Sequence, residues 1–309
     1  MRAVKLAAGS GRDAFSSVIP TVATLLLAVT TALAPLAPAA LAASVAPPAN
    51  ASAAAARPKV VFDQPSAYGR VIVVEEARRR ALRFDDVSGV DHSIVSLDDP
   101  ASVPMEYVRY AGMGLLFVPE PGNVLMIGLG GGSFSGLIHR VLPEARIDVV
   151  EINPVVVEAA KGFFGVVEDE RYRVHLADGA AFVHDAKARY DLIFADAGSG
   201  DGVIPEPFTT ERFFAAVRER LAPNGVLVVN LGLDDGINAI IARRVKAAFD
   251  GGACAGVRTP VDANYLVFAT MNSAAPDERQ LRTRAATLDG RRLLPYPLAP
   301  LAAQLGRCP

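Results

Sequence analysis

The sequence has no tryptophan, and aromatic residues account for only 7% of its 309 residues. Lysine and arginine number 31 against 33 aspartates and glutamates, and no basic block stands out along the chain. Proteins that bind nucleic acids usually concentrate positive charge on one surface, and many stack bases on aromatic side chains. The composition therefore argues against a nucleic-acid partner.

Cysteine and histidine are also scarce, and their spacing does not resemble a set of metal ligands. The residues concerned are His92, His139, His175, His184, Cys254 and Cys308. In an exported protein the two cysteines are a candidate disulfide that would join the C-terminal tail to the rest of the chain. In a reducing cytosol they would be two separate thiols. The sequence predicts no metal site and leaves both alternatives for the cysteines open.

Charge is almost missing from the first 56 residues, where it is confined to residues 2–13. A long apolar run follows and ends in a small-residue A-x-A motif at 40–42. A basic start, an apolar middle and such a motif predict a signal peptide over residues 1–42, and therefore an exported protein. An uncleaved membrane anchor is the first alternative, and a wrongly assigned start codon is the second.

The rest of the chain divides into four parts by composition and pattern. Residues 43–58 form an Ala/Pro linker. Residues 59–103 contain short, β-branched segments between polar turns, which predict a small antiparallel β-unit. Residues 104–272 form the main domain, and residues 273–309 a C-terminal helical tail.

The main domain opens with a predicted helix over residues 104–117, in which Tyr107 and Tyr110 fall near one face. At this spacing tyrosines are more often core residues than pocket residues. From residue 124 apolar strands alternate with amphipathic helices, and two further strands follow at the end. This order predicts an α/β domain whose parallel sheet is covered by helices on both faces.

A glycine-rich turn follows the first of these strands, in the stretch VLMIGLGGGSFSG. Gly128, Gly130 and Gly131 let the backbone approach a ligand closely, and the next helix starts near Ser133 with its N-terminus toward that ligand. Glu151 ends the following strand, where a carboxylate can accept hydrogen bonds from both hydroxyls of a ribose. The two features together predict a nucleoside-binding site.

Two further strands also end in acidic residues, Asp178-Gly179 and Asp196. Ligands of open α/β sheets bind outside the carboxyl ends of the strands. Asp178 is placed to meet an adenine amino group, and Asp196 lies above the same edge. Three acids around a glycine turn favour a site of the S-adenosylmethionine type over a dinucleotide site.

An ordered set of motifs now carries a specific resemblance. The segments IGLGGGS, VVEINPVVVEAA, DGAAFV, YDLIFADAGSGDGVIPEPFTTERFF and LAPNGVLVVNL resemble the spermidine synthase (polyamine aminopropyltransferase) family, and more closely its exported or membrane-associated spermidine-synthase-like branch. The likeness covers about residues 60–270. It implies a Rossmann-like sheet of the S-adenosylmethionine-methyltransferase type, preceded by a small β-unit, and a homodimer.

The resemblance also implies roles for acidic residues. Glu151 matches the ribose-binding acid, Asp178 the acid near adenine, and Asp196 the first aspartate of the catalytic loop. Asp201 matches the second acid only loosely, because the loop is one residue longer. Glu206 follows as another candidate contact for the amine.

The chain departs from the family pattern at two places. Ser133 stands where the family has the aspartate of GGGDGG, and the glutamine expected after Tyr68 is replaced by glycine. Tyr68 remains a candidate substrate contact. These departures concern the amine and the tail of the donor, and they leave the nucleoside site intact.

The resemblance implies aminopropyl transfer from decarboxylated S-adenosylmethionine to a small amine such as putrescine, with Asp196 accepting the proton. One alternative is a methyltransferase that uses intact S-adenosylmethionine, since an aspartate in place of Ser133 would repel the carboxylate of that donor. Another is an exported, non-catalytic module that binds nucleosides. The predicted export favours the last alternative, because sulfonium donors are made in the cytosol.

Overall fold

The computed structural model describes residues 58–198, 203–232, 234–262, 264–272 and 276–308. The predicted signal peptide or anchor (residues 1–42) and residues 43–57 of the predicted linker lie outside these ranges. Among the residues that are described, no helix combines the length and the apolar character needed to cross a membrane.

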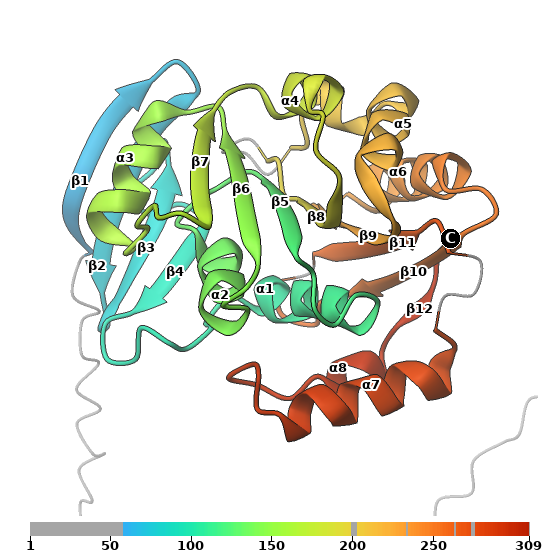
Figure 1. Cartoon of the computed structure of the whole chain (residues 1–309). Coiled ribbons are helices and arrows are strands. Elements are labelled where there is room, and N and C mark those ends of the chain that lie inside the picture. The colour runs from blue at the N-terminus through green and yellow to red at the C-terminus, as the bar shows by residue number, and fades with distance from the viewer. Residues whose placement is uncertain (1–57, 199–202, 233, 263, 273–275, 309) are drawn as a thin grey trace, which may run out of the picture. The chain divides into compact units, whose positions relative to one another are not determined.

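A four-stranded antiparallel sheet opens the described chain, as the sequence predicted (Figure 1). Its strands follow one another in chain order: β1 (Lys59–Ser66), β2 (Gly69–Glu76), β3 (Arg79–Phe84) and β4 (Ser93–Ser96). The turn between β2 and β3 holds Ala77 and Arg78 at positive φ, the backbone conformation of a tight hairpin.

The main sheet has eight strands in the order β12-β10-β11-β9-β8-β5-β6-β7. Five of them are parallel: β5 (Asn123–Ile127), β6 (Arg146–Glu151), β7 (Tyr172–Leu176), β8 (Tyr190–Ala195) and β9 (Leu221–Leu231). The last three are antiparallel: β10 (Ala253–Arg258), β11 (Tyr265–Thr270) and β12 (Gly306–Arg307). The sheet is therefore mixed, and β5 is in the middle of its five parallel strands.

Helices cover both faces of the main sheet, which confirms the predicted fold class (Figure 1). One face packs against α4 (Gly179–Asp185), α5 (Glu211–Arg220) and α6 (Asp235–Ala248). The other packs against α2 (Ser133–Val141), α3 (Pro154–Phe163) and α7 (Glu278–Gly290). Successive β5 residues alternate between these two cores: Val124 and Met126 join one, Leu125 and Ile127 the other.

The helix predicted over residues 104–117 is shorter than expected. Helix α1 (Glu106–Ala111) gives way to a 3₁₀ helix, η1 (Gly112–Leu116). Glycine disfavours a continuing α-helix, and here two glycines also allow close packing. A Cβ on Gly112 would lie 2.4 Å from the hydroxyl oxygen of Tyr296, and one on Gly114 would lie 3.0 Å from a methyl of Leu192.

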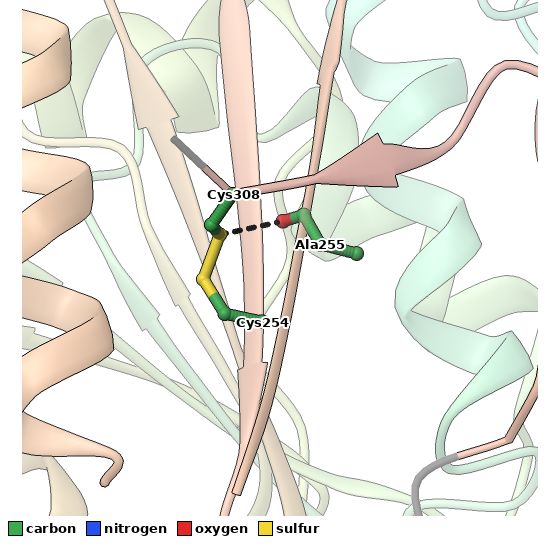
Figure 2. The surroundings of a disulfide bond; sticks show 3 residues. All are labelled: Cys254, Ala255 and Cys308. Carbon is green, nitrogen blue, oxygen red and sulfur yellow. Dashed lines mark hydrogen bonds between the residues drawn. A yellow bond between two sulfur atoms is a disulfide. The ribbon is translucent and has the colours of Figure 1, made fainter.

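The C-terminal tail is only partly helical. After α7 and the short α8 (Ala299–Ala302) the chain forms β12, which pairs with β10. Cys308, directly after β12, forms a disulfide with Cys254 in β10 across a sequence separation of 54 residues (Figure 2). The Cys308 sulfur also lies 3.4 Å from the carbonyl oxygen of Ala255. The tail is thus joined covalently to the edge of the main sheet.

Candidate functional site

The site lies where the strand order reverses, between β5 and its neighbours β6 and β8. The backbone N–H of Gly128 donates to Val150 O (2.8 Å), and that of Asp196 donates to Ile127 O (2.9 Å). Gly128 has a φ of 95°, and a Cβ there would lie 2.3 Å from the carbonyl oxygen of Asp196. Only glycine fits at this point. Its lack of a side chain lets the glycine turn and the end of β8 lie in direct contact. Open α/β sheets bind ligands at such a switch point.

The next glycines of the turn pack against the N-terminal sheet. The N–H of Gly131 donates to Ser93 Oγ in β4 (2.8 Å), and a Cβ on Gly130 would lie 2.8 Å from the same oxygen. The sequence explained these glycines by a close approach to a ligand. In the structure the protein's own β4 already requires them to be small.

Glu151, at the end of β6, is buried and faces the glycine turn. Its two carboxylate oxygens accept hydrogen bonds from the N–H groups of Leu129 (3.0 Å) and Asn153 (2.9 Å). Burial raises the pKa of Glu151, and the backbone hydrogen bonds oppose that shift. The carboxylate therefore holds the turn and the start of α3 together at the place where the sequence puts a ribose.

Ser133 is the first residue of α2 and follows Gly132, whose φ of 72° is left-handed. It lines a cavity of about 230 Å³ beside the glycine turn. Its wall combines apolar residues of β4 and of the segments before α1 and after α3 with polar side chains that include His139, Arg140 and Asp169. A larger cavity, about 590 Å³, lies between α5 and α6 and touches none of the predicted site residues.

Asp178 and Gly179 start α4 at the end of β7. The exposed Asp178 carboxylate accepts a hydrogen bond from Ala181 N (2.8 Å), so it caps the helix. A Cβ on the buried Gly179 would lie 2.6 Å from a methyl of Ile127 and 3.3 Å from the Phe208 ring. Asp178 thus has a structural role at the position where the sequence predicts a contact with adenine.

The turn between β1 and β2 reaches Asn153, which follows the predicted ribose-binding acid Glu151. Ser66 Oγ accepts hydrogen bonds from the N–H of Tyr68 and from the side chain of Asn153, both at 3.0 Å. Asn153 in turn donates its backbone N–H to Glu151. The Tyr68 side chain is half exposed. The predicted substrate contact, Tyr68, therefore lies in a turn that is hydrogen-bonded to Asn153, which is itself hydrogen-bonded to Glu151.

The predicted contacts for the amine are spread over one loop. Asp201 lies outside the described residues. Glu206 begins a 3₁₀ helix, η2 (Glu206–Thr209), and its side chain is exposed. The described part of the loop does not bring Glu206 into a hydrogen bond with any other predicted site residue.

Asp196 has partners that the sequence did not single out. Its Oδ1 accepts a hydrogen bond from the side chain of Asn230, at the end of β9 (2.8 Å). The Tyr107 side chain from α1 lies close enough to interact with the same carboxylate. Burial raises the pKa of Asp196, and the interactions with Asn230 and Tyr107 partly offset the rise. The only signal for Asn230 was its place at a strand end, and Tyr107 was interpreted as a core residue.

Within the described ranges, no group of three or more His, Cys, Asp or Glu side chains could hold a metal ion. Glu151 and Asp196 lie at the carboxyl ends of β6 and β8, on either side of β5 and its glycine turn. A buried carboxylate beside a glycine turn, with a second carboxylate across β5, is the arrangement that the sequence predicted for an α/β protein with a nucleoside site.

Comparisons with known proteins agree with this class. Residues 107–233 match the family described as spermine/spermidine synthase domain. A polyamine aminopropyltransferase of Chromobacterium violaceum is 34% identical over 73% of this chain and 85% of its own length. The chain therefore belongs to the polyamine aminopropyltransferase (spermidine synthase) family, as the motifs implied.

Two solved structures share the fold. A spermidine synthase in complex with the transition-state analogue AdoDATO has a TM-score of 0.62 and 18% identity, over 80% of this chain and 84% of that one. Human methyltransferase-like protein 13 in complex with SAH has a TM-score of 0.56 and 28% identity, over 62% of this chain and 94% of that one. Both carry ligands of the S-adenosylmethionine type.

Proposed function

We propose that the protein transfers an aminopropyl group from decarboxylated S-adenosylmethionine to a small amine such as putrescine. One observation carries the proposal: the half-buried Asp196 lies at the strand switch point, where its backbone contacts Gly128 of the glycine turn and Ile127 before it. Family membership supports the same reaction. Glu151, Asp178 and the glycine turn are the proposed contacts of the donor.

The reaction needs an unprotonated amine. An alkylammonium has a pKa of about 10.4 in water, so a base must take its proton before or during attack. The amine nitrogen then forms a bond to the carbon next to the sulfonium. The carbon–sulfur bond breaks with its electron pair going to sulfur, which leaves methylthioadenosine. Asp196 accepts the proton, and alignment of nitrogen with that carbon supplies much of the acceleration.

The test is an assay of the full-length chain with decarboxylated S-adenosylmethionine and putrescine, with methylthioadenosine followed by mass spectrometry. We expect product with the wild type and none with Asp196→Asn. Asp185→Asn is the matched control, because Asp185 is an exposed carboxylate on α4 and pairs, within the described part of the chain, with its neighbour His184 alone. Equal turnover by wild type and Asp196→Asn would refute the role of Asp196.

Methyl transfer is the second candidate, and Ser133 favours it. The serine removes a negative charge that would repel the carboxylate of intact S-adenosylmethionine, and methyltransferase-like protein 13 shares the fold. Titration with each donor separates the two reactions. A clear preference for the decarboxylated donor excludes methyl transfer. Binding of methylthioadenosine without any turnover would indicate a non-catalytic nucleoside-binding module.

Export, with either cleavage or membrane attachment at the N-terminus, is part of the proposal. Two observations support it: the signal-peptide pattern of residues 1–42 and the Cys254–Cys308 disulfide, since stable disulfides are typical of oxidising compartments. Fractionation of producing cells and N-terminal sequencing of the protein test this point. A homodimer, which the family resemblance implies, is tested by light scattering of the purified protein.

A further inference from the structure

We propose that Tyr107 and Asn230 are positioning residues that hold the Asp196 carboxylate in one orientation, and that the loop between β10 and β11 fixes them both. The inference rests on the proposed function, because it assumes that Asp196 receives the proton of the amine. It adds residues from α1, from β9 and from the described residues 259–262 and 264 to a site that the motifs place on β5, β6, β7 and β8.

The first support is a chain of side-chain amides. Asn230 donates from Nδ2 to Asp196 Oδ1 at 2.8 Å, and its own Oδ1 accepts from Asn264 Nδ2 at 2.8 Å. Because the Asn264 amide occupies the oxygen of Asn230, the N–H₂ group of Asn230 must face the carboxylate. The backbone carbonyl of Asn264 accepts from Thr259 N at 2.9 Å, which closes the loop on itself.

The second support comes from the start of α1. The N–H of Tyr107 donates to Asp262 Oδ2 at 2.9 Å. In the opposite direction, Glu106 Oε2 accepts from Val261 N at 2.6 Å and more weakly from Asp262 N at 3.3 Å. The helix start and the loop therefore cap each other. This clasp holds the buried Tyr107 beside Asp196, whose pKa it lowers.

The groups that support Asp196, the amide of Asn230 and the phenol of Tyr107, are both neutral, and this affects how the carboxylate can bind an amine. An arginine or lysine paired with Asp196 would compete with the ammonium of the acceptor for the carboxylate. Among the described residues, no ion pair involves Asp196. An amide and a phenol orient the carboxylate and leave lone pairs for the amine.

Few of the described titratable groups influence the pKa values of Tyr107 and Asp196. Burial raises the pKa of Tyr107, and the charges of Asp196 and Asp262 raise it further, so the phenol keeps its proton and remains a donor. On Asp196, burial raises the pKa while Asn230 and Tyr107 lower it. Removal of either donor should therefore raise the pKa of Asp196 further.

The test compares Tyr107→Phe with Tyr110→Phe, its neighbour on the same helix. Tyr110 donates to Gln304 Oε1 in the tail (2.9 Å), away from the site. We expect Tyr107→Phe to lower kcat/KM by about tenfold to a hundredfold, the range for one hydrogen bond to a charged group. Its effect should fall on kcat, and the acidic limb of the pH profile should move to higher pH. Tyr110→Phe should leave both quantities at wild-type values.

A second measurement does not depend on turnover. With aspartate labelled with ¹³C at the side-chain carboxyl, the Asp196 resonance is assigned by its loss in Asp196→Asn and then titrated. We expect a higher pKa in Tyr107→Phe and in Asn230→Ala, but not in Tyr110→Phe. An unchanged Asp196 titration in both variants would overturn the inference. An inactive wild type with the expected titration shifts would refute the proposed reaction and retain the positioning of Asp196.

Discussion

The two halves of the carboxyl edge are built in different ways. On the donor side, Glu151 is bonded to backbone N–H groups of the glycine turn and of the residue before α3. On the proposed acceptor side, Asp196 is hydrogen-bonded to Asn230 of β9 and interacts with a side chain from α1. The donor side is thus held by neighbours within about one strand–turn–helix unit, whereas the acceptor side depends on segments far apart in the chain.

The difference shows which half can change without loss of the fold. Glu151 is hydrogen-bonded to the backbone of the glycine turn. A protein that retains this turn for its ligand is therefore expected to retain the acid as well. A carboxylate held by side chains can gain or lose partners by single substitutions. The donor side is therefore expected to resist change, and the acceptor side to determine which amine reacts.

The largest effect is expected for Asp196→Asn. Removal of a general base costs about 10²–10⁴ in rate, so turnover should fall by that factor or more, while methylthioadenosine affinity stays within severalfold. Because burial raises the pKa of Asp196 in the folded state, its charge lowers stability as the pH rises from the unfolded toward the folded pKa. Calorimetry at pH 7 should show a Tm for Asp196→Asn no lower than that of wild type; a clear drop would contradict this reading.

The disulfide comes next, and it tests stability without touching either half of the site. A bridge across 54 residues limits the unfolded chain and is worth about 4 kcal/mol by the loop-entropy relation. Cys254→Ser with Cys308→Ser should lower the free energy of unfolding by up to that amount in denaturant titrations. Reduction of the wild type should reproduce the loss. Equal denaturation midpoints with and without the disulfide would show that the covalent attachment of β12 adds little to the stability.

Glu151→Gln should have an intermediate effect that combines stability with donor binding. Glutamine has one side-chain oxygen, so it cannot accept from both Leu129 N and Asn153 N, and one buried N–H loses its partner. We expect a loss of about 1–3 kcal/mol in the free energy of unfolding and weaker binding of methylthioadenosine. Glu158→Gln, an exposed change on α3, is the control. Affinity equal to wild type would exclude Glu151 from the donor site.

Ser93→Ala should give the smallest effect of the series. It removes the acceptor of the Gly131 N–H, which costs about 1 kcal/mol, and loosens the contact between the N-terminal sheet and the glycine turn. Ser88→Ala, outside the strands, provides the baseline. If Ser93→Ala reduces donor affinity more than stability, the N-terminal sheet contributes to the shape of the donor site.

Much of the donor side was predictable because its parts are local. The helix cap at Asn153 and the proline at the start of α3 follow rules that a few neighbouring residues set. The glycine turn and the acid at the end of the next strand belong to one such unit. What the sequence missed was the reason for Gly130 and Gly131, since the contact with Ser93 joins residues about 38 positions apart.

The sequence by itself determined the α/β class, the family and the line of acids at the carboxyl edge, because periodicity, turns and motifs depend on residues close together in the chain. Only the tertiary structure decided that Tyr107 and Asn230 meet at Asp196, and that the tail ends as a strand bonded to β10. Residues 107 and 196, like 254 and 308, become neighbours only when the sheet order and the packing of α1 and β12 bring them together. No local pattern encodes such distant pairings, since their stability comes from the assembled core.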